Sequence, residues 1–380
     1  MSARSLYFVA GEASGDAHGA ALMRALQSLA PEMKFVGRGG PRMREIAGGE
    51  FIDWSESSSV LGLWEVLKQY GYFRQHFAAT IEQIRASNPD AVVLIDYPGF
   101  NLRLARALRD QLPKLKIIYY ISPQVWAWNR RRIPKMARYL DLMLCIFPFE
   151  AELYNQSGLR TVFVGHPMIE SLAARRVPGA READLIGFFP GSRAREIRKI
   201  LPVMLATAAR ISAKKPHVRF EVAAASPTLA RQIEAGVQAA GFSAAAVRVS
   251  VGEASAAMQR AAVGIVASGT ATLEAAFFLM PFVLVYRVAW VTYIAARAVV
   301  KVKHLGMPNV LAGRAIVPEF IQHRARADLL ADAVMRLLDT ETAREEMLAD
   351  FNKVIAQLGD AGASLKAADA IVRELGPTPA

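Results

Sequence analysis

The sequence predicts an α/β protein built from two Rossmann-like domains, each a doubly wound parallel sheet, facing a central cleft. Apolar runs of strand length alternate with helical patterns along the 380 residues, which is typical of β/α units in a parallel sheet. This alternation breaks after Val164-Gly165-His166-Pro167-Met168 and then resumes. A chain of this length also fits two domains better than one core.

We expect these domains over residues 1–168 and 169–350, followed by a C-terminal segment over residues 351–380. The strands expected in the first domain are Leu6–Ala10, Lys34–Gly37, Ala91–Ile95, Ile117–Ile121, Leu142–Ile146 and Thr161–Val164. Those expected in the second are Leu185–Phe189, Arg219–Ala224, Val247–Val251, Val263–Val266 and Phe282–Tyr286. Such sheets bind ligands at the carboxyl ends of their strands, so we expect the active site in the cleft.

The composition favours an anionic partner and a reducing compartment. The net charge of +12 suits nucleic acid, an acidic membrane surface or a phosphorylated substrate. Hydrophobic residues make up 53% of the chain, which excludes a disordered protein. The single cysteine, Cys145, allows no internal disulfide and fits the cytosol. We expect no secretory signal, because the apolar run near the N-terminus is too short for one. We expect no transmembrane segment, because the longest apolar stretch contains Arg287 and Arg297.

Two glycine-rich turns in the second domain predict a diphosphate site. Their residues are Gly191, Ser192 and Arg193 in the first turn, and Ser268, Gly269, Thr270, Ala271 and Thr272 in the second. Each turn follows an expected strand and opens a helix, whose free N–H groups and dipole favour phosphate. Arg193 adds a charge suited to a leaving diphosphate. Neither turn matches a P-loop or GxGxxG pattern, which disfavours NTPases and standard dehydrogenases.

Glu274 and Asn309 are further candidates for the same site. Glu274 lies in the first turns of the helix after the second turn, where a carboxylate can accept bonds from ribose hydroxyls. The alternative for Glu274 is favourable placement at the helix N-terminus. Asn309 follows Pro308 in an expected loop and can bond a sugar or phosphate, although turn chemistry alone also explains it.

The first domain offers candidate acids and bases. Glu12, Asp16 and His18 lie in the glycine-rich stretch after the first strand, where Ser14 or Asp16 can alternatively cap a helix. Asp96 ends a strongly apolar strand, where burial raises a carboxyl pKa towards the range of a general base. The alternative for Asp96 is turn formation before Pro98-Gly99.

Aromatic and apolar segments suggest a sugar or lipid surface. Trp126 and Trp128 precede Arg130–Arg132 and can stack on a sugar or base or lie at a membrane interface, unless they belong to an ordinary amphipathic helix. The segment over 60–73 is very apolar for a connecting helix, and we expect an acceptor and membrane patch there. The members of this patch are Leu61, Leu63, Trp64, Val66 and Leu67. The segment over 288–300 is either core or a second patch. No metal-ligand spacing and no nucleic-acid-binding module is recognisable, so we expect neither partner.

Together these motifs resemble the lipid-A-disaccharide synthase family, bacterial glycosyltransferases of the GT-B type. The resemblance covers most of the chain and rests on long motifs in the expected order. They include Gly11-Glu12-Ala13-Ser14-Gly15-Asp16, Ile95-Asp96-Tyr97-Pro98-Gly99-Phe100-Asn101, Ser122-Pro123-Gln124-Val125-Trp126-Ala127-Trp128, Pro190-Gly191-Ser192-Arg193, Ser268-Gly269-Thr270-Ala271-Thr272-Leu273-Glu274 and Pro308-Asn309. Arg38 departs from the pattern, because a small residue is expected before the Gly39-Gly40-Pro41 turn, and its role stays open.

The resemblance implies an inverting transfer of 2,3-diacylglucosamine from UDP-2,3-diacylglucosamine to the 6-hydroxyl of 2,3-diacylglucosamine 1-phosphate (lipid X). It implies work in the cytoplasm at the anionic inner-membrane surface, without a cofactor or metal. It also implies a C-terminal helix that returns to the first domain, and a homodimer formed by C-terminal exchange. In this scheme Asp96 is the base, with Glu12 or His18 as alternatives. Arg193 and the two turns hold the diphosphate, Glu274 holds the ribose, and Asn309 orients donor groups.

Two other functions stay open on the sequence. One is another GT-B enzyme acting on soluble UDP-sugars, either a transferase or an epimerase. The other is a non-catalytic nucleotide- or lipid-binding protein on the same scaffold. Activity without an acylated acceptor would favour the former, and UDP binding without product would favour the latter.

Overall fold

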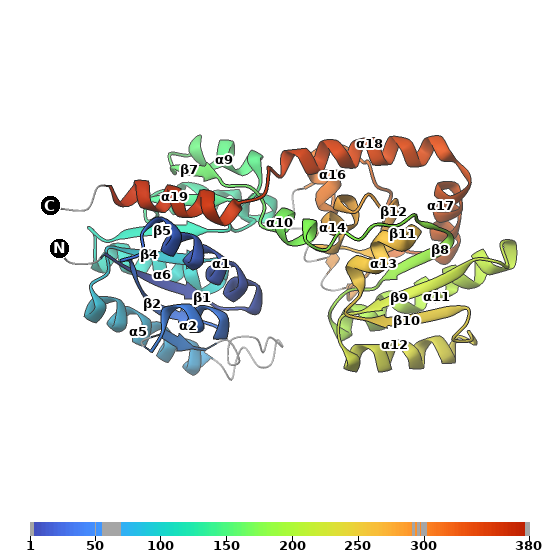
Figure 1. Cartoon of the computed structure of the whole chain (residues 1–380), viewed down its shortest axis with the longest axis horizontal. Coiled ribbons are helices and arrows are strands. Elements are labelled where there is room, and N and C mark those ends of the chain that lie inside the picture. Colours follow the sequence, from blue (N-terminus) through green and yellow to red (C-terminus); the bar gives the residue numbers. More distant parts are fainter. Residues whose placement is uncertain are drawn as a thin grey trace. The chain divides into compact units, whose positions relative to one another are not determined.

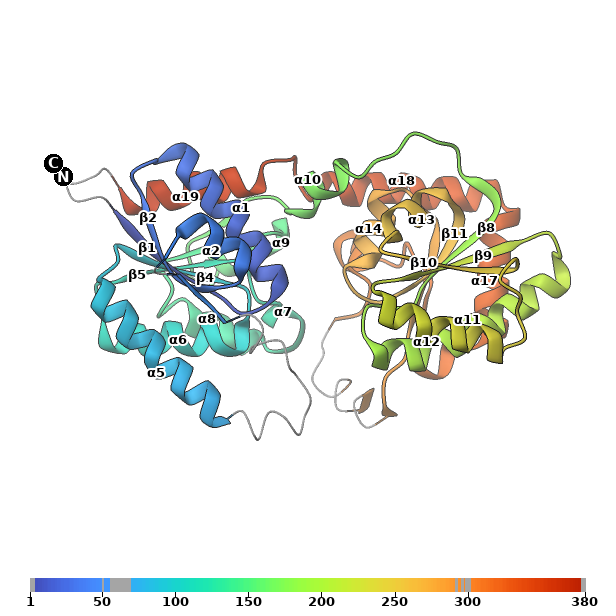
Figure 2. The ribbon, with the colours of Figure 1, turned by 60° about the horizontal axis from the view of Figure 1, so that its bottom comes forward.

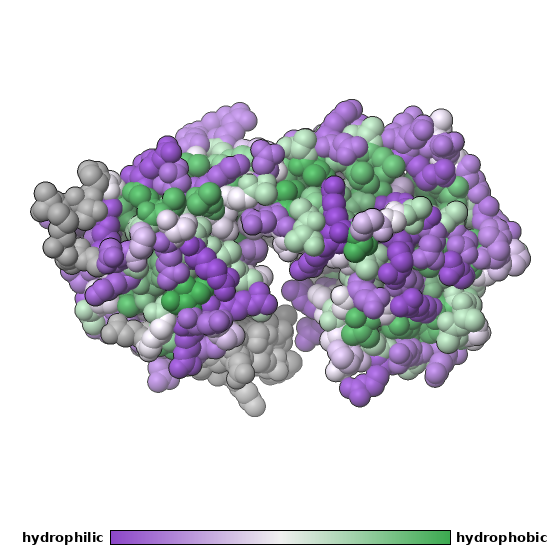
Figure 3. All heavy atoms as spheres, in the orientation of Figure 1, coloured by the Kyte–Doolittle hydropathy of each residue, from purple (hydrophilic) through white to green (hydrophobic). Residues whose placement is uncertain are grey.

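The computed structural model describes residues 4–49, 51–54, 70–290, 293, 294, 297 and 302–376. The chain forms two compact units (Figure 1). The first unit comprises Met1–Pro167 and Leu358–Ala380, and the second comprises Met168–Gln357. The visible face of each unit is covered mainly by hydrophilic side chains, with smaller hydrophobic groups between them (Figure 3).

The described part of the first unit contains a seven-stranded parallel sheet in the order β3-β2-β1-β4-β5-β6-β7. The strands are β1 Ser5–Ala10, β2 Lys34–Gly39, β3 Phe51–Asp53, β4 Ala91–Ile95, β5 Lys116–Tyr120, β6 Leu142–Cys145 and β7 Thr161–Phe163. Most strand residues are buried because helices cover both faces, as a parallel sheet requires. The structure therefore confirms the predicted doubly wound sheet.

The helices of the first unit cover both faces of the sheet, because alternate residues along each strand point to opposite faces. They are α1 Ala13–Leu29, α2 Pro41–Ala47, α5 Tyr70–Ser87, α6 Pro98–Gln111, α7 Val125–Trp128, α8 Ile133–Met136, α9 Pro148–Asn155 and α19 Ala363–Leu375. Leu6 and Phe8 point to the core shared with α1, α2 and α19. Their neighbours Tyr7 and Val9 point to the core shared with α5 and α6. Figure 2 shows these helix layers on opposite faces of the sheet.

The second unit repeats this architecture with a six-stranded sheet among its described residues, in the order β10-β9-β8-β11-β12-β13. The strands are β8 Glu182–Phe189, β9 Arg219–Ala224, β10 Val247–Val251, β11 Ala261–Ala267, β12 Phe282–Tyr286 and β13 Glu319–Ile321. The helices are α10 Met168–Ala173, α11 Ala194–Lys214, α12 Pro227–Ala239, α13 Ala254–Arg260, α14 Ala271–Phe277, α16 Met307–Ala312, α17 Ala327–Asp339 and α18 Glu341–Gln357. Helix α11 packs against α12 and α17, whereas α14 packs against α16 and α18.

Two strands were not predicted, and the return of the C-terminal segment begins later than expected. Strands β3 and β13 span three residues each, which is too short for a period-2 pattern to stand out. Helix α18 stays in the second unit to Gln357, beyond the predicted boundary at 351, because Phe351 is buried and stacks on Phe282. Helix α19 then packs along α1 in the first unit.

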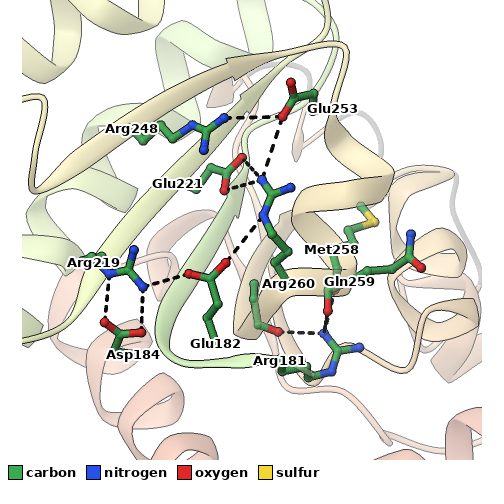
Figure 4. A network of polar contacts seen from close by, with 11 residues as sticks. Arg181, Glu182, Asp184, Arg219, Glu221, Arg248, Glu253, Met258, Gln259 and Arg260 are labelled. Atoms are coloured by element: carbon green, nitrogen blue, oxygen red, sulfur yellow. Dashed lines mark hydrogen bonds and ion pairs between the residues drawn. The ribbon is translucent and has the colours of Figure 1, made fainter. Parts of the chain in front are cut away.

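An ion-pair network fixes the amino-terminal edge of the second sheet (Figure 4). Arg260 donates two 2.8 Å bonds to the buried carboxylate of Glu221, and Arg219 bonds Asp184. Arg181 donates to carbonyl oxygens at the end of α13 and to Phe278 at the end of α14, where the helix dipoles favour a cation. These charges are satisfied by one another at the amino edge. The opposite, carboxyl edge carries the predicted phosphate-binding turns.

Candidate active site

Both sheets place the predicted site residues where the strand order reverses. In the first unit the chain runs from β1 outward to β3 and then returns to β4 beside β1. In the second it runs from β8 outward to β10 and returns to β11 beside β8. Helices after adjacent strands diverge to opposite faces at such a point and leave a crevice at the carboxyl ends. Glu12 and Asp96 follow β1 and β4, and Arg193 and Ser268 follow β8 and β11.

Asp96 occupies a strained turn at the end of β4. Its φ is 45° and that of Tyr97 is 49°, so two consecutive residues with side chains adopt the left-handed region. The buried side chain of Asn101 donates to the carbonyls of Ile95 (3.1 Å) and Asp96 (2.8 Å). The Tyr119 hydroxyl donates to the Asp96 carbonyl at 2.5 Å. These bonds hold the turn and leave the Asp96 carboxyl half-buried at the carboxyl edge.

The surroundings of the Asp96 carboxyl raise its pKa, as a general base requires. Its pKa is raised from the ordinary value, first by burial and then by the nearby charge of Glu12, while a backbone bond at Tyr97 lowers it. Two carboxylates that share one site cannot both ionise freely. The structure thus brings Glu12 and Asp96 together, with exposed Glu12 modulating the more buried Asp96.

Asp16 has a structural role that the sequence left open. The stretch over 11–19 is not a loop, because α1 already begins at Ala13. The buried Asp16 carboxylate accepts bonds from the backbone N–H groups of Gly40, Arg42 and Met43. It caps the start of α2 rather than its own helix, and the Gly39-Gly40-Pro41 turn is held by this carboxylate.

His18 lies beside His166, a residue that the sequence suggested only as part of a domain boundary. Burial lowers the pKa of His18, and burial together with His18 lowers that of His166 to about 4. Both rings are therefore neutral at neutral pH. His166 packs against Phe147, with ring centroids 5.3 Å apart, and its backbone N–H donates to Leu358. A neutral His18 can accept or donate a hydrogen bond but supplies no fixed positive charge.

The first turn of the second unit requires glycine at its tightest point. Gly191 has φ 105°, and a Cβ there would approach Glu196 Oε2 to 2.3 Å. Ser192 and Arg193 are exposed. The Arg193 guanidinium pairs with Glu196 at 3.3 Å, and its side chain is 81% exposed. Arg193 is thus held loosely and stays available to a ligand at the N-terminus of the long helix α11.

The second turn lies next to the first. Val266 pairs in register with Phe189, so the residues that follow β11 and β8 leave the sheet at the same level. Gly269 has φ 146°, and the buried Thr272 hydroxyl donates to its carbonyl at 2.8 Å. Ser268, Thr270 and Ala271 surround it, with Gly269 and Thr270 exposed. The structure therefore brings the two glycine turns together at one edge.

The surroundings of the Glu274 carboxyl favour the binding of a polar ligand. Burial raises the pKa of its carboxyl, and the nearby charge of Arg175 partly offsets this rise. Arg175 follows α10 and was not predicted, because nothing in the local sequence links it to a helix so far along the chain. No hydrogen bond to the Glu274 carboxylate is found within the described ranges. A ribose with two hydroxyl donors would supply such bonds.

Asn309 is engaged with its own loop. Its buried side chain accepts from Ile316 and Val317 N–H at 2.8 Å each. It donates to the Val317 carbonyl and to Glu319 Oε1, also at 2.8 Å. These bonds use both ends of the amide, so any influence of Asn309 on a donor passes through the loop that it holds together.

Replacing Asn309 by Ala is expected to lower the free energy of unfolding of the second unit by about 1–3 kcal/mol, because several buried polar groups lose their partner. Urea unfolding of the full chain measures this loss. Asn352→Ala, at an exposed position of α18, is the control. Unchanged stability combined with weaker UDP binding would contradict the positioning role and favour direct contact with the donor.

Trp126 is part of the core, and Trp128 is the accessible indole of this segment. The Trp126 indole N–H donates to the buried Glu150 carboxyl at 2.8 Å. Trp128 is 38% exposed, with the Arg132 guanidinium 4.8 Å from its ring centroid. Of the predicted stacking surface, only Trp128 and the adjacent Arg132 therefore stay accessible to a sugar or base. Burial raises the pKa of Glu150 to about 7, although bonds from its neighbours oppose the rise.

Glu150→Gln is expected to change the pH dependence of stability. The folded state of the wild type holds this proton up to a pKa of about 7, above the ordinary Glu value, so wild-type stability falls as pH rises through this range. The Gln variant lacks this loss and should gain up to about 3 kcal/mol relative to wild type between about pH 5 and pH 8. Urea unfolding at both pH values measures the difference. The exposed Glu152→Gln is the control, and a pH-independent difference would contradict the assignment.

The predicted acceptor and membrane patch of Leu61, Leu63, Trp64, Val66 and Leu67 lies outside the described residues. Within the part of the chain that the structure covers, no helix has the length and apolarity to cross a membrane. The same part contains no group of three or more histidine, cysteine or acidic residues that could hold a metal ion.

Arg38, whose role the sequence left open, is buried, bonds Gln83 and His76, and lies over the Trp54 ring.

Comparison with known proteins agrees with this architecture. A family model described as lipid-A-disaccharide synthetase matches residues 6–372. The lipid-A-disaccharide synthase of Geobacter sulfurreducens is 39% identical over 383 residues, covering 98% of this chain and 97% of the relative. A UDP-N-acetylglucosamine 2-epimerase from Listeria monocytogenes, described as putative, has a similar fold with TM-score 0.67 and 13% identity, covering 100% and 98% of the chains. The calicheamicin glycosyltransferase CalG4 matches with TM-score 0.60 and 14% identity, covering 100% of both chains.

Proposed function

The chain belongs to the lipid-A-disaccharide synthetase family, and we propose on this basis how its residues carry out glycosyl transfer in lipid A biosynthesis. The fold is of the GT-B type. Fold likeness alone does not separate a transferase from an epimerase, because both occur among the structural neighbours. The near full-length sequence relatives are named synthases and favour the transferase.

The substrates follow from this assignment. The donor is UDP-2,3-diacylglucosamine and the acceptor is 2,3-diacylglucosamine 1-phosphate. The products are the β-linked disaccharide 1-phosphate and UDP. The acceptor 6-hydroxyl oxygen forms the new bond to the anomeric carbon, and the bond from that carbon to the diphosphate breaks. The hydroxyl proton passes to a base, and the electron pair of the broken bond leaves with UDP.

The first unit supplies the base in this proposal. Asp96 takes the proton of the acceptor hydroxyl, because its carboxyl lies at the carboxyl edge with a raised pKa. Glu12 keeps that pKa raised by its charge. His18 and His166 stay neutral and are suited to hydrogen bonds with sugar hydroxyls. The single observation that carries this assignment is the convergence of Glu12 and Asp96 at the strand-order reversal.

The second unit stabilises the leaving group. Gly191, Ser192 and the residues from Ser268 to Thr272 offer N–H and hydroxyl donors at one edge. Arg193 balances the charge that grows on the diphosphate as the bond breaks. Glu274 accepts bonds from the ribose, and Asn309 shapes the neighbouring loop.

We also propose where the enzyme works and how its copies assemble. The enzyme works in the cytoplasm at the anionic inner-membrane surface, where both acylated substrates reside, without a cofactor or nucleic acid. The position of α19, packed in the first unit after α18 of the second, suits a homodimer in which C-terminal helices exchange between copies.

Mass spectrometry of a reaction with both acylated substrates tests the function. We expect the tetraacyl disaccharide 1-phosphate and UDP in equal amounts. Product from a soluble sugar acceptor alone would support the other transferase, and conversion of the UDP-sugar without an acceptor would support an epimerase. UDP binding without any product would support a non-catalytic protein.

A further inference from the structure

Arg38 is a buried cation that the proposed mechanism does not use. It is the penultimate residue of β2 and is only 4% exposed. Strand β2 lies beside β1, so Arg38 stands near the carboxyl edge of the first sheet, in the unit that supplies the proposed base. The sequence motifs leave its role open, because a small residue is expected at this position.

The side chain of Arg38 bonds neutral groups of the described residues. Its Nε donates to Gln83 Oε1 at 2.8 Å, and its Nη1 donates to His76 Nδ1 at 3.0 Å. The guanidinium carbon lies 5.9 Å from the centroid of the Trp54 ring. Because a guanidinium only donates, His76 Nδ1 is an acceptor and the imidazole is therefore uncharged. The pKa of His76 is lowered in agreement with this, first by burial and then by Arg38.

The charge of Arg38 has no counter-charge among the described residues. None of their carboxylates pairs with it, and none of their acceptors bonds its Nη2 group. Asp16, beside the turn that follows β2, already accepts from backbone N–H groups at the start of α2. A cation buried without a counter-charge destabilises a protein. Such a residue is expected where a ligand supplies the missing charge.

Neighbouring groups hold the Arg38 side chain in place without neutralising it. The Tyr7 hydroxyl donates to the same Gln83 oxygen at 2.9 Å, which fixes the amide that Arg38 bonds. The Trp54 indole N–H donates to a carbonyl of β1 at 2.6 Å, which fixes the ring that the guanidinium faces. His76 and Gln83 are only half-buried, so the guanidinium ends close to the surface of the unit. A cation held in this way is preorganised to bind an anion.

The sheet places Arg38 about one sugar ring away from the proposed base. Arg38 lies opposite Val9 of β1, and β1 separates β2 from β4, which Asp96 follows. Two strand spacings amount to about 10 Å across the sheet. Trp54 lies in this interval, because its ring is edge-on to that of Tyr97, the residue after Asp96, with centroids 6.3 Å apart. A ligand that spans the interval can therefore meet a carboxylate at one end and a guanidinium at the other.

We propose that Arg38 binds the phosphate of the acceptor sugar and makes this chain selective for a phosphorylated acceptor. The identity of the anion rests on the proposed function, in which the acceptor is a sugar 1-phosphate and Asp96 is the base. The donor diphosphate is assigned to the second unit, so the acceptor phosphate is the substrate anion left for the first. The 6-hydroxyl and the 1-phosphate stand at opposite ends of the acceptor ring, which fits Asp96 at one end and Arg38 at the other.

Binding of two acceptors to the full-length protein tests the assignment. The probes are 2,3-diacylglucosamine 1-phosphate and the same sugar without its phosphate, each dispersed in an uncharged detergent and titrated by calorimetry. Arg38→Met should weaken binding of the phosphorylated probe about 10- to 150-fold, the loss of one hydrogen bond to a charged group. Binding of the unphosphorylated probe should stay near that of wild type, because this probe carries nothing for the guanidinium to pair with.

Two further variants separate the role of charge from that of shape. Arg44→Met removes an exposed arginine from the last turn of α2 and should leave both affinities unchanged. Arg38→Lys keeps the charge but loses the planar fork, so it should recover part of the preference for the phosphorylated probe. Urea unfolding of Arg38→Met should show no loss of stability, because methionine removes a buried charge that has no counter-charge.

The outcomes separate a phosphate-binding Arg38 from a structural one. Equal weakening of both probes in Arg38→Met, or a marked loss of its stability, would make Arg38 structural and overturn the proposal. Unchanged binding of the phosphorylated probe would overturn it as well. In turnover assays Arg38→Met should raise KM for the phosphorylated acceptor more than it lowers kcat, because Asp96 is untouched. A wild type that forms no product, but binds the phosphorylated probe through Arg38, would support this site and reject the proposed function alone.

Discussion

Replacing Asp96 by Asn is expected to lower turnover about 100- to 10,000-fold, the usual contribution of a positioned general base. The amide keeps the size and the strained turn but cannot accept the hydroxyl proton. Affinity for UDP should stay near that of wild type, because the residues proposed for UDP belong to the second unit. Steady-state kinetics and calorimetry with UDP measure the two effects. Asp110→Asn, on the exposed side of α6, is the matched control.

The pH profile separates a catalytic Asp96 from a merely structural one. Because the pKa of Asp96 is raised, the rate should fall on the acid side at a higher pH than an ordinary Asp would produce. Glu12→Gln removes the second cause of that rise and should move this acid limb to lower pH. An Asp96→Asn enzyme with wild-type turnover, or an acid limb that does not respond to Glu12→Gln, would remove the pair from the mechanism.

Replacing Arg193 by Ala is expected to weaken UDP binding about 10- to 150-fold, the equivalent of one lost hydrogen bond to a charged group of about 1.5–3 kcal/mol. The guanidinium is 81% exposed and held by one 3.3 Å ion pair, so its removal should cost little stability. The loss should therefore appear in calorimetry with UDP and in turnover, with an unchanged unfolding curve.

Neighbouring substitutions provide controls for Arg193. Arg195→Ala removes an exposed cation two positions further along the chain, in the first turn of α11, and should leave UDP affinity unchanged. Arg193→Lys keeps the charge but loses the two-pronged geometry, so it should recover part of the affinity. UDP affinity that is the same in Arg193→Ala and wild type would exclude the first turn from the diphosphate site.

Local signals identified most of the residues that we propose for the site. Asp96 was recognisable because an apolar strand ends in a carboxylate, and Gly191 and Gly269 because glycine permits turns that a Cβ would obstruct. Pairing between distant segments was not recognisable. The proximity of His18 to His166, and of Glu274 to Arg175, depends on which strands and helices become neighbours.

Some polar residues that looked functional form hydrogen bonds within the protein itself. The Asp16 carboxylate accepts a hydrogen bond from the start of α2, and the Trp126 indole N–H donates to Glu150. The Asn309 side chain accepts a hydrogen bond from the segment before β13. A buried polar group must find a partner because leaving it unsatisfied is costly. The sequence shows the polar group but not the partner, so it overstates how many such groups face a substrate.

Local sequence patterns were sufficient to predict the two parallel-sheet domains, the order of their main elements and the position of the two glycine-rich turns. Hydrophobic periodicity and glycine conformation act over a few residues, and these local rules are enough for that. Folding in three dimensions was needed to establish which side chains remain available at the carboxyl edges, where the C-terminal helix packs, and how the segments after β12 and β13 are joined. Those features come from contacts between residues far apart in the chain, as between Asp16 and Met43 or Val288 and Gln322, and packing selects such contacts only once the sheets have formed.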